Sequence, residues 1–276
     1  MEFSKVQGLG NDFIIINDLE ENISDYSSLA QKVCNRYFGV GGDGLMVVLP
    51  SDKADFRMRI INSDGSEPEM CGNGIRCFAK YVYDKNLTEK EDLTIETLAG
   101  IIKPKLIVEN GQARLVKVDM GEPRLFREEI PAQGERGTKV INEDLSIGDR
   151  NFQITCVSMG NPHCIIFTDN ADTLVNKYGP LAETHSFFPR KTNVEFVEVI
   201  NEKEVKMRVW ERGAGITLAC GTGACATTVA CVLNNKTNRE VTVHLLGGDL
   251  KIEWSEENNH IYMTGPAEIV FDGKLL

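Results

Sequence analysis

The chain has 276 residues, of which 42% are hydrophobic and 26% are charged, and its formal net charge is −11 at pH 7. This composition is typical of a folded globular protein and argues against intrinsic disorder. The excess of acidic residues argues against broad binding of nucleic acid or anionic membranes, so we expect neither partner. Residues 13–16 form an apolar run that is far too short for a signal core or a membrane span. Eight cysteines without such a signal predict free thiols and a cytoplasmic location.

The first half of the chain has the pattern of short strands with one well-marked helix. Apolar residues alternate with arginines over 56–60, which is the period of a half-buried strand. After the turn at 71–74, apolar residues recur at helical spacing over 75–82. This pattern predicts a helix that begins at the glycine-containing turn.

The second half follows the same plan. The segment 126–150 is charged and contains several glycines, so we expect it to be an irregular start to this half, with a boundary near Met120. Residues 207–209 resemble a strand, and the turn at 220–223 precedes an apolar run over 224–233. That run is apolar enough to predict a buried helix.

Landmarks of the first half recur in the second at an offset of about 150 residues. The pairs are Gly10-Asn11 with Gly160-Asn161, Asp43 with Asn193, Asn62 with Glu211, Cys71 with Cys220, and Gly100 with Gly248. We interpret the halves as two similar α+β domains, residues 1–119 and 120–265, with 266–276 returning to complete the first. We expect the domains to face each other, with the active site in the cleft between them.

The two Cys-Gly-x-Gly turns hold the candidate catalytic residues. A cysteine at the start of a helix lies beside backbone N–H groups without intrahelical partners, and the helix dipole favours its thiolate. Cysteine pKa values in such places fall to about 3.5–7.5. The glycines allow backbone N–H groups to approach a substrate carboxylate. A single such cysteine is more often a small buried hydrophobe, but two at corresponding places favour a functional pair.

Two facing cysteines predict stereoinversion by general acid–base catalysis. One thiolate removes a Cα proton from one face of an amino acid, and the opposing thiol delivers a proton to the other face. Because the Cα proton is only weakly acidic, the site must exclude water and hold its hydrogen-bond donors in place.

Several polar residues accompany the cysteines. Glu211 and Arg212 lie in a glycine-rich turn and are candidates to hold the two ends of an amino acid, although a solvated surface turn is the alternative. His163 is a candidate to tune a cysteine, although a lone histidine is more often structural. Four asparagines fall at the repeat landmarks and predict a polar pocket: Asn11, Asn62, Asn161 and Asn193.

No metal or cofactor is expected. The chain has no Cys-x-x-Cys pair, and its cysteine spacings do not fit common structural zinc sites. Neither glycine turn is followed by Lys-Ser or Lys-Thr, and neither continues into a dinucleotide fingerprint. We expect the remaining cysteines to pack in cores: Cys34, Cys77, Cys156, Cys164, Cys225 and Cys231.

These motifs together resemble the diaminopimelate epimerase family. Residues 62–76 look like its first signature, and residues 211–224 resemble its second. Residues 10–13 and 160–163 are similar to two further landmarks of the family. The resemblance covers essentially the whole chain in the expected order.

The resemblance implies a pseudo-symmetric α+β fold of two mixed β-barrel-like rolls, each around a central helix, assembled as a homodimer. The implied reaction interconverts LL- and meso-2,6-diaminopimelate, in L-lysine and peptidoglycan-precursor biosynthesis, without pyridoxal phosphate or metal. Cys71 and Cys220 would be the acid/base pair, conventionally donor and acceptor, with His163 and Glu211 adjusting their pKa values. The residues that would hold the substrate are Asn11, Asn62, Gly72, Asn73, Asn161, Asn193, Glu211, Arg212, Gly221 and Thr222.

One departure and three alternatives bear on this interpretation. Many members of the family have glutamine where Gly44 stands, so no side-chain contact carries over there. Proline racemase-type enzymes also use two cysteines, but they typically have histidine where Asn73 stands and lack the 211–213 turn. Phenazine-biosynthesis isomerases share the fold without the cysteine pair. A thiol redox or binding protein without turnover would show no hydrogen exchange at a substrate Cα.

Overall fold

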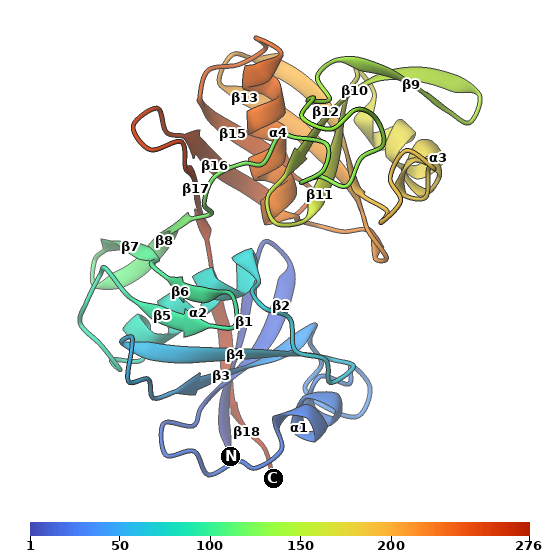
Figure 1. Cartoon of the computed structure of the whole chain (residues 1–276). Helices are drawn as coiled ribbons and strands as arrows, with labels where there is room; N and C mark the ends of the chain where they lie inside the picture. The colour runs from blue at the N-terminus through green and yellow to red at the C-terminus, as the bar shows by residue number, and fades with distance from the viewer. The chain divides into compact units, whose positions relative to one another are not determined.

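The computed structural model describes residues 1–276 and divides them into two compact units. Unit 1 comprises Met1–Asp119 and Thr264–Leu276, and unit 2 comprises Met120–Met263. Both units combine helices with mixed sheets, so the predicted α+β class is confirmed (Figure 1). None of the helices combines the length and the apolar character that a membrane crossing requires.

Unit 1 is built on a seven-stranded mixed sheet with the order β18-β1-β2-β3-β4-β5-β6. Because β18 pairs antiparallel with β1, the C-terminal residues complete the sheet in which the chain begins. Helix α2 packs against β1, β2, β3 and β8. The elements of this unit are β1 (Glu2–Gly8), β2 (Asn11–Asn17), α1 (Tyr26–Val33), β3 (Gly44–Leu49), β4 (Phe56–Asn62), α2 (Gly72–Asp84), β5 (Ile95–Thr97), β6 (Gly100–Ile102), β7 (Lys105–Glu109), β8 (Gln112–Asp119) and β18 (Glu268–Lys274).

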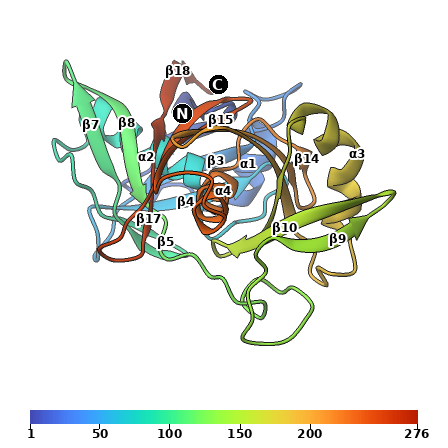
Figure 2. The same ribbon diagram turned by 90° about the horizontal axis from the view of Figure 1, so that it is seen from above.

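Unit 2 surrounds its own central helix, α4, with strands. Its sheet has the order β17-β16-β15-β13-β12-β11-β10-β9, and β14 pairs with β13. Helix α4 packs against β10, β11, β12, β13, β15 and β16, and Figure 2 views this helix end-on. The elements are β9 (Glu143–Ile147), β10 (Arg150–Ser158), β11 (Pro162–Phe167), α3 (Ala171–Glu183), β12 (Asn193–Asn201), β13 (Glu204–Glu211), β14 (Gly215–Ile216), α4 (Gly221–Leu233), β15 (Glu240–Leu245), β16 (Gly248–Trp254) and β17 (Ile261–Pro266), which continues into unit 1.

Both predicted central helices are present. The apolar residues of 75–82 lie on the buried part of α2, and nearly all of α4 is buried, as its apolar sequence predicts. The six cysteines that we expected in cores, Cys34, Cys77, Cys156, Cys164, Cys225 and Cys231, are all buried. The prediction for 126–150 is partly wrong, because β9 forms a hairpin with β10 inside that segment. Gly148 makes this hairpin possible, since its φ of 60° is a left-handed conformation that favours glycine.

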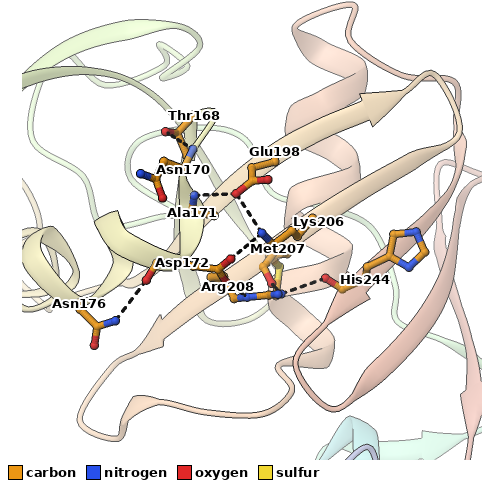
Figure 3. Close-up of polar contacts among 10 residues, drawn as sticks. All are labelled: Thr168, Asn170, Ala171, Asp172, Asn176, Glu198, Lys206, Met207, Arg208 and His244. Carbon is orange, nitrogen blue, oxygen red and sulfur yellow. Dashed lines mark hydrogen bonds and ion pairs between the residues drawn. The ribbon is translucent and has the colours of Figure 1, made fainter.

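Helix α3 is held against β12 and β13 by a polar network on the side of unit 2 shown in Figure 3. Glu198 Oε1 accepts a hydrogen bond from Ala171 N at 2.8 Å, which satisfies a free N–H group at the helix start. Asp172 pairs with Lys206 at 2.6 Å and also with Arg208. These contacts attach the helix to the neighbouring strands.

The strand registers of the two units define how the repeat aligns. In unit 1 the parallel strands β2 and β3 pair Phe13 with Gly44, and in unit 2 β11 and β12 pair His163 with Asn193. Asn193 therefore corresponds to Gly44, one residue after the landmark Asp43 chosen from the sequence. The sequence missed this register because Gly44 has no side chain to mark the position.

Candidate active site

Unit 1 places Cys71 at the N-cap of α2. Its backbone is extended, with φ −137° and ψ 120°, and Gly74 N donates to Cys71 Sγ at 3.3 Å. Asn11 Oδ1 lies 3.6 Å from the same sulfur, and Asn73 Nδ2 donates to that oxygen at 3.4 Å. Gly72 is the first residue of the helix. The structure thus brings together four residues predicted for the site.

The orientation of the Asn11 amide follows from its other partner. Asn11 Nδ2 donates to Asp43 Oδ2 at 2.7 Å. An ionised carboxylate only accepts hydrogen bonds, so it fixes the NH₂ group on its own side and leaves the amide oxygen toward Cys71. Asp43, which the sequence offered only as a repeat landmark, therefore orients a candidate substrate-binding residue.

A charged cluster supports the same loop. Asp12 pairs with Lys5 and, at 2.8 Å, with Arg36, which also bonds Asp43 at 2.8 Å. Burial alone would raise the pKa of Asp12, but the bonds from Arg36 and Lys5 outweigh it and lower that pKa to about 2. The cluster ties the segment after α1 to the start of β2, beside Asn11.

Arg76 fixes the first turn of α2 from within the core. Its side chain is fully buried, and it donates to Gly72 O and Asn73 Oδ1, each at 3.0 Å. Both acceptors belong to residues predicted to contact the substrate carboxylate. In the sequence, Arg76 stands among apolar residues at helical spacing. This position is the signal that could have identified it as a buried arginine rather than a surface one.

Two other positions of unit 1 lie at the ends of β3 and β4. Asn62 pairs with Gly44 in the strand register, and its Nδ2 donates to Ser66 Oγ at 2.9 Å, within its own loop. A Cβ at Gly44 would lie 2.8 Å from the carbonyl oxygen of Ile61. This backbone therefore has no room for the side chain that many family members carry there.

Unit 2 places Cys220 at the N-cap of α4 in the same way. Its backbone is extended, with φ −125° and ψ 105°, and the residue is only 5% exposed. Gly221 and Thr222 form the start of the helix, where N–H groups are available to an anion. Thr222 Oγ1 lies 3.6 Å from Cys220 Sγ, within hydrogen-bonding distance for sulfur.

A chain of polar side chains leads from Thr222 into the core. Asn161 Nδ2 donates to Thr222 Oγ1 at 3.2 Å, and Asn161 Oδ1 lies 3.0 Å from His163 Nε2. His163 Nδ1 lies 2.6 Å from Glu195 Oε1. Asn161, His163, Thr222 and Cys220 were all predicted for the site, whereas Glu195 was not. A glutamate among the apolar residues of a buried strand is the signal that identifies it.

The expected low pKa is wrong for Cys220. Burial raises the pKa of its thiol well above the usual range, and the carboxylates of Glu211 and Glu195 raise it further. The hydrogen bond with Thr222 acts in the opposite direction. Desolvation and two nearby negative charges therefore outweigh the helix N-terminus, on which the prediction depended.

The turn that carries Glu211 and Arg212 is fixed by side chains from two elements. Glu183, at the end of α3, accepts from Trp210 Nε1 at 2.8 Å and from Gly213 N at 3.0 Å. Burial favours the neutral form of Glu183, but these bonds lower its pKa, so its carboxylate is charged at neutral pH. Sequence reasoning also missed this residue.

Asn193 supports the turn from β12. Its Oδ1 accepts from Arg212 N at 2.9 Å, and its Nδ2 donates to Pro162 O at 2.8 Å. The Arg212 guanidinium donates to Arg190 O at 3.4 Å, and Glu211 accepts from Thr217 Oγ1. Both ends of the Asn193 amide therefore bond to backbone groups at or next to other candidate residues, the N–H of Arg212 and the carbonyl between Asn161 and His163.

The described residues contain no group of three or more His, Cys, Asp or Glu side chains placed to hold a metal ion. Each unit instead presents one cysteine at a helix N-terminus with an asparagine close by. Such groups can exchange a proton with a substrate and bind its carboxylate through backbone N–H groups.

Three structural comparisons describe the fold. A phenazine biosynthesis protein of the PhzF family from Bacillus anthracis aligns with a TM-score of 0.74 at 21% identity, over 100% of this chain and 99% of its own. A probable proline racemase from Agrobacterium radiobacter aligns with a TM-score of 0.68 at 13% identity, over 100% and 92%. A hydroxyproline epimerase from Agrobacterium vitis has a TM-score of 0.67 at 13% identity, over 100% and 90%. At these identities the likeness establishes the fold alone.

Sequence comparison is more specific. The model of the family described as diaminopimelate epimerase matches residues 3–126 and 155–270. A diaminopimelate epimerase of Moorella thermoacetica is 57% identical over 275 residues, covering 99% of this chain and 98% of its own. That of Methanococcus maripaludis is 56% identical over 276 residues, covering 100% and 99%. The chain therefore belongs to the diaminopimelate epimerase family.

Proposed function

We propose that this chain interconverts LL-2,6-diaminopimelate and meso-2,6-diaminopimelate by proton transfer at Cα, in L-lysine and peptidoglycan-precursor biosynthesis. The observation that carries this proposal is the paired placement of Cys71 and Cys220, each at the N-cap of a central helix. Membership of the family, with relatives more than half identical over nearly the full length, supports the substrate.

In the proposed reaction the cysteines divide the work between the two faces of Cα. One thiolate takes the Cα proton, and the electron pair left on carbon is stabilised by the bound carboxylate and its hydrogen-bond donors. The other thiol then delivers its proton to the opposite face. After turnover the two cysteines have exchanged protonation states, so the same pair serves the reverse reaction.

The remaining candidate residues take supporting roles in this proposal. His163 and Glu211 adjust the pKa values of the cysteines. The first turns of α2 and α4 bind the reacting carboxylate through Gly72, Asn73, Gly221 and Thr222, and the other substrate contacts come from Asn11, Asn62, Asn161, Asn193, Glu211 and Arg212. The mechanism requires that residues of both predicted domains, 1–119 with 266–276 and 120–265, reach one substrate.

We also propose that the protein acts as a cytoplasmic homodimer, without metal or pyridoxal phosphate and without nucleic-acid or membrane partners. The net charge of −11 supports the last two points, because it opposes attraction to polyanions.

The test is an epimerisation assay with LL-diaminopimelate in heavy water, with L-proline and L-glutamate as controls. We expect conversion to the meso isomer and incorporation of deuterium at Cα, unchanged after dialysis against chelator or treatment with hydroxylamine under reducing conditions. Turnover of proline in place of diaminopimelate would refute the substrate. Activity lost on either treatment and restored by metal or pyridoxal phosphate would refute the cofactor-free mechanism.

A further inference from the structure

A buried acid–histidine pair is connected to Cys220 through the side chains of Asn161 and Thr222. The side chains of His163 and Glu195 are both fully buried, and Nδ1 and Oε1 are 2.6 Å apart. The second carboxyl oxygen, Glu195 Oε2, is also buried and has no hydrogen-bond partner. Placing such groups in a core costs desolvation energy, so apolar residues at both positions would serve the stability of the folded unit better.

The other half of the chain shows that the fold does not need this pair. In the aligned registers, Phe13 occupies the place of His163, and Met46 occupies the place of Glu195. The glycines of the helix starts confirm the match: a Cβ at Gly74 would meet Met46 Sδ at 3.4 Å, and one at Gly223 would meet Glu195 Oε1 at 2.8 Å. The polar pair is therefore specific to the half that contains Cys220.

The polar chain connects this pair to the sulfur with a definite direction. An amide oxygen can only accept, so His163 Nε2 must donate to Asn161 Oδ1. Asn161 Nδ2 then donates to Thr222 Oγ1, which leaves the threonine proton free to point at Cys220 Sγ. Each group donates toward the sulfur, so the chain opposes the burial and the carboxylate charges that raise the pKa of the Cys220 thiol.

The carboxyl of Glu195 fixes this direction in both of its protonation states. When Glu195 is ionised, the ring opposite it carries protons on both nitrogens. When Glu195 is protonated, it donates to Nδ1, and the single ring proton stays on Nε2. Burial raises the pKa of Glu195, and the neighbouring His163 acts to lower it. In either state Nε2 donates to Asn161.

We propose that Glu195 is a positioning residue for the epimerase reaction: it holds His163 with a proton on Nε2 and thereby directs the Asn161–Thr222 chain to donate to Cys220. This inference rests on the proposed function, in which Cys220 is one of the two acid/base groups. Glu195 acts only through His163 and the chain, and it need not touch the substrate.

The kinetic test compares three variants of the full-length protein. Glu195→Met introduces the residue that unit 1 has at this position and removes the hydrogen bond to His163. Glu195→Gln keeps a donor, since its NH₂ group can hydrogen-bond to Nδ1. Glu198→Met is the matched control, because it makes the same change on the same strand at a residue that contacts α3 (Figure 3).

We expect Glu195→Met to lower kcat by about 10- to 100-fold, the range set by losing one charge-assisted hydrogen bond, with KM changed less than about threefold. Glu195→Gln should recover most of this loss, and Glu198→Met should keep the wild-type kcat. Wild-type kcat in folded Glu195→Met would overturn the proposal. So would a Glu195→Gln variant as slow as Glu195→Met, because the position of the proton would then not matter.

Nitrogen-15 NMR of the imidazole rings of the wild-type protein provides a test that does not depend on activity. The chain has four histidines, and the His163 signals are identified by their loss in His163→Gln. We expect wild-type His163 to carry a proton on Nε2, either alone or with one on Nδ1. A ring protonated only on Nδ1 would overturn the proposal. A wild-type protein inactive on diaminopimelate would refute the proposed function instead, and the NMR result would still decide the role of Glu195 in orienting His163.

Discussion

Gly223→Ala tests how closely α4, Cys220 and Glu195 pack together. An added Cβ would lie 2.8 Å from Glu195 Oε1 and 3.2 Å from Cys220 Cβ and Sγ. Replacing glycine by alanine inside a helix is otherwise favourable by about 1 kcal/mol. Here the carboxyl must move by several tenths of an ångström, and it is enclosed and bonded to His163 at 2.6 Å. Losing a hydrogen bond to a charged group costs about 1.5–3 kcal/mol, so we expect a net destabilisation of about 0.5–2 kcal/mol.

Gly74→Ala is the matched control in unit 1. Its Cβ would meet Ile60 Cδ1 at 3.2 Å, Cys71 Cβ at 3.3 Å and Met46 Sδ at 3.4 Å. Side-chain methyl and thioether groups can yield by a few tenths of an ångström, and no buried hydrogen bond is lost. We therefore expect the helix-propensity gain to offset the strain, with a net change below about 1 kcal/mol.

The assay is thermal unfolding together with epimerase kinetics, in a double-mutant cycle with Glu195→Met. For a unit of this size, about 0.5–2 kcal/mol corresponds to a Tm lower by about 1–8 °C. In the Glu195→Met background the Gly223→Ala change should cost little, because unit 1 accommodates the same pairing at Gly74 and Met46. The reasoning would be refuted if Gly223→Ala were as stable as wild type, or if its cost were the same in both backgrounds.

Three further predictions concern the thiols, the turn and the acid cluster. Cys71→Ala and Cys220→Ala should each abolish epimerisation. In heavy water, proton NMR should show that each variant exchanges the α-hydrogen of at most one stereoisomer, and that this isomer differs between the two variants. Near-wild-type turnover by either variant would show that its missing cysteine serves only in packing. Glu183→Leu should release the 211–213 turn and raise KM for diaminopimelate about tenfold, and an unchanged KM would contradict that role. The pKa of Asp12 is lowered to about 2 in the folded protein. The ionised carboxylate therefore stabilises the fold above about pH 4, and this stabilisation is lost as pH falls through about 2. Arg36→Gln should therefore lower the free energy of unfolding at pH 5 more than at pH 2, in urea titrations, and an equal loss at both would contradict the linkage.

Features that depend on local sequence were predictable. The periodicity of 75–82 and the apolar run of 224–233 identified the two central helices, because helical burial follows directly from spacing along the chain. The Cys-Gly-x-Gly turns identified the cysteines at the helix starts for the same reason. The repeated Gly-Asn pair identified the asparagines at 11 and 161, and both glycines have a positive φ, 85° and 93°, that favours glycine.

Features that depend on contacts between distant segments were not predictable. The raised pKa of Cys220 arises from burial and from Glu211 and Glu195, which belong to strands that the helix contacts only in the folded unit. The repeat alignment at Asp43 failed by one residue for a similar reason, because strand register is set by pairing across the sheet rather than by side-chain identity.

The differences between the two halves fall where the proposed mechanism requires them. Two thiols in identical surroundings would share the single negative charge equally, so neither would be fixed as the base or as the acid. Here Asn11 turns its amide oxygen toward Cys71, whereas Asn161 gives its oxygen to His163 and its NH₂ group to Thr222. The first arrangement gives the Cys71 thiol an acceptor. The second aims a donor at Cys220, which acts against the burial and the carboxylates that raise the pKa of that thiol. The two halves thus orient their asparagines with different residues, Asp43 in one half and the His163–Glu195 pair in the other.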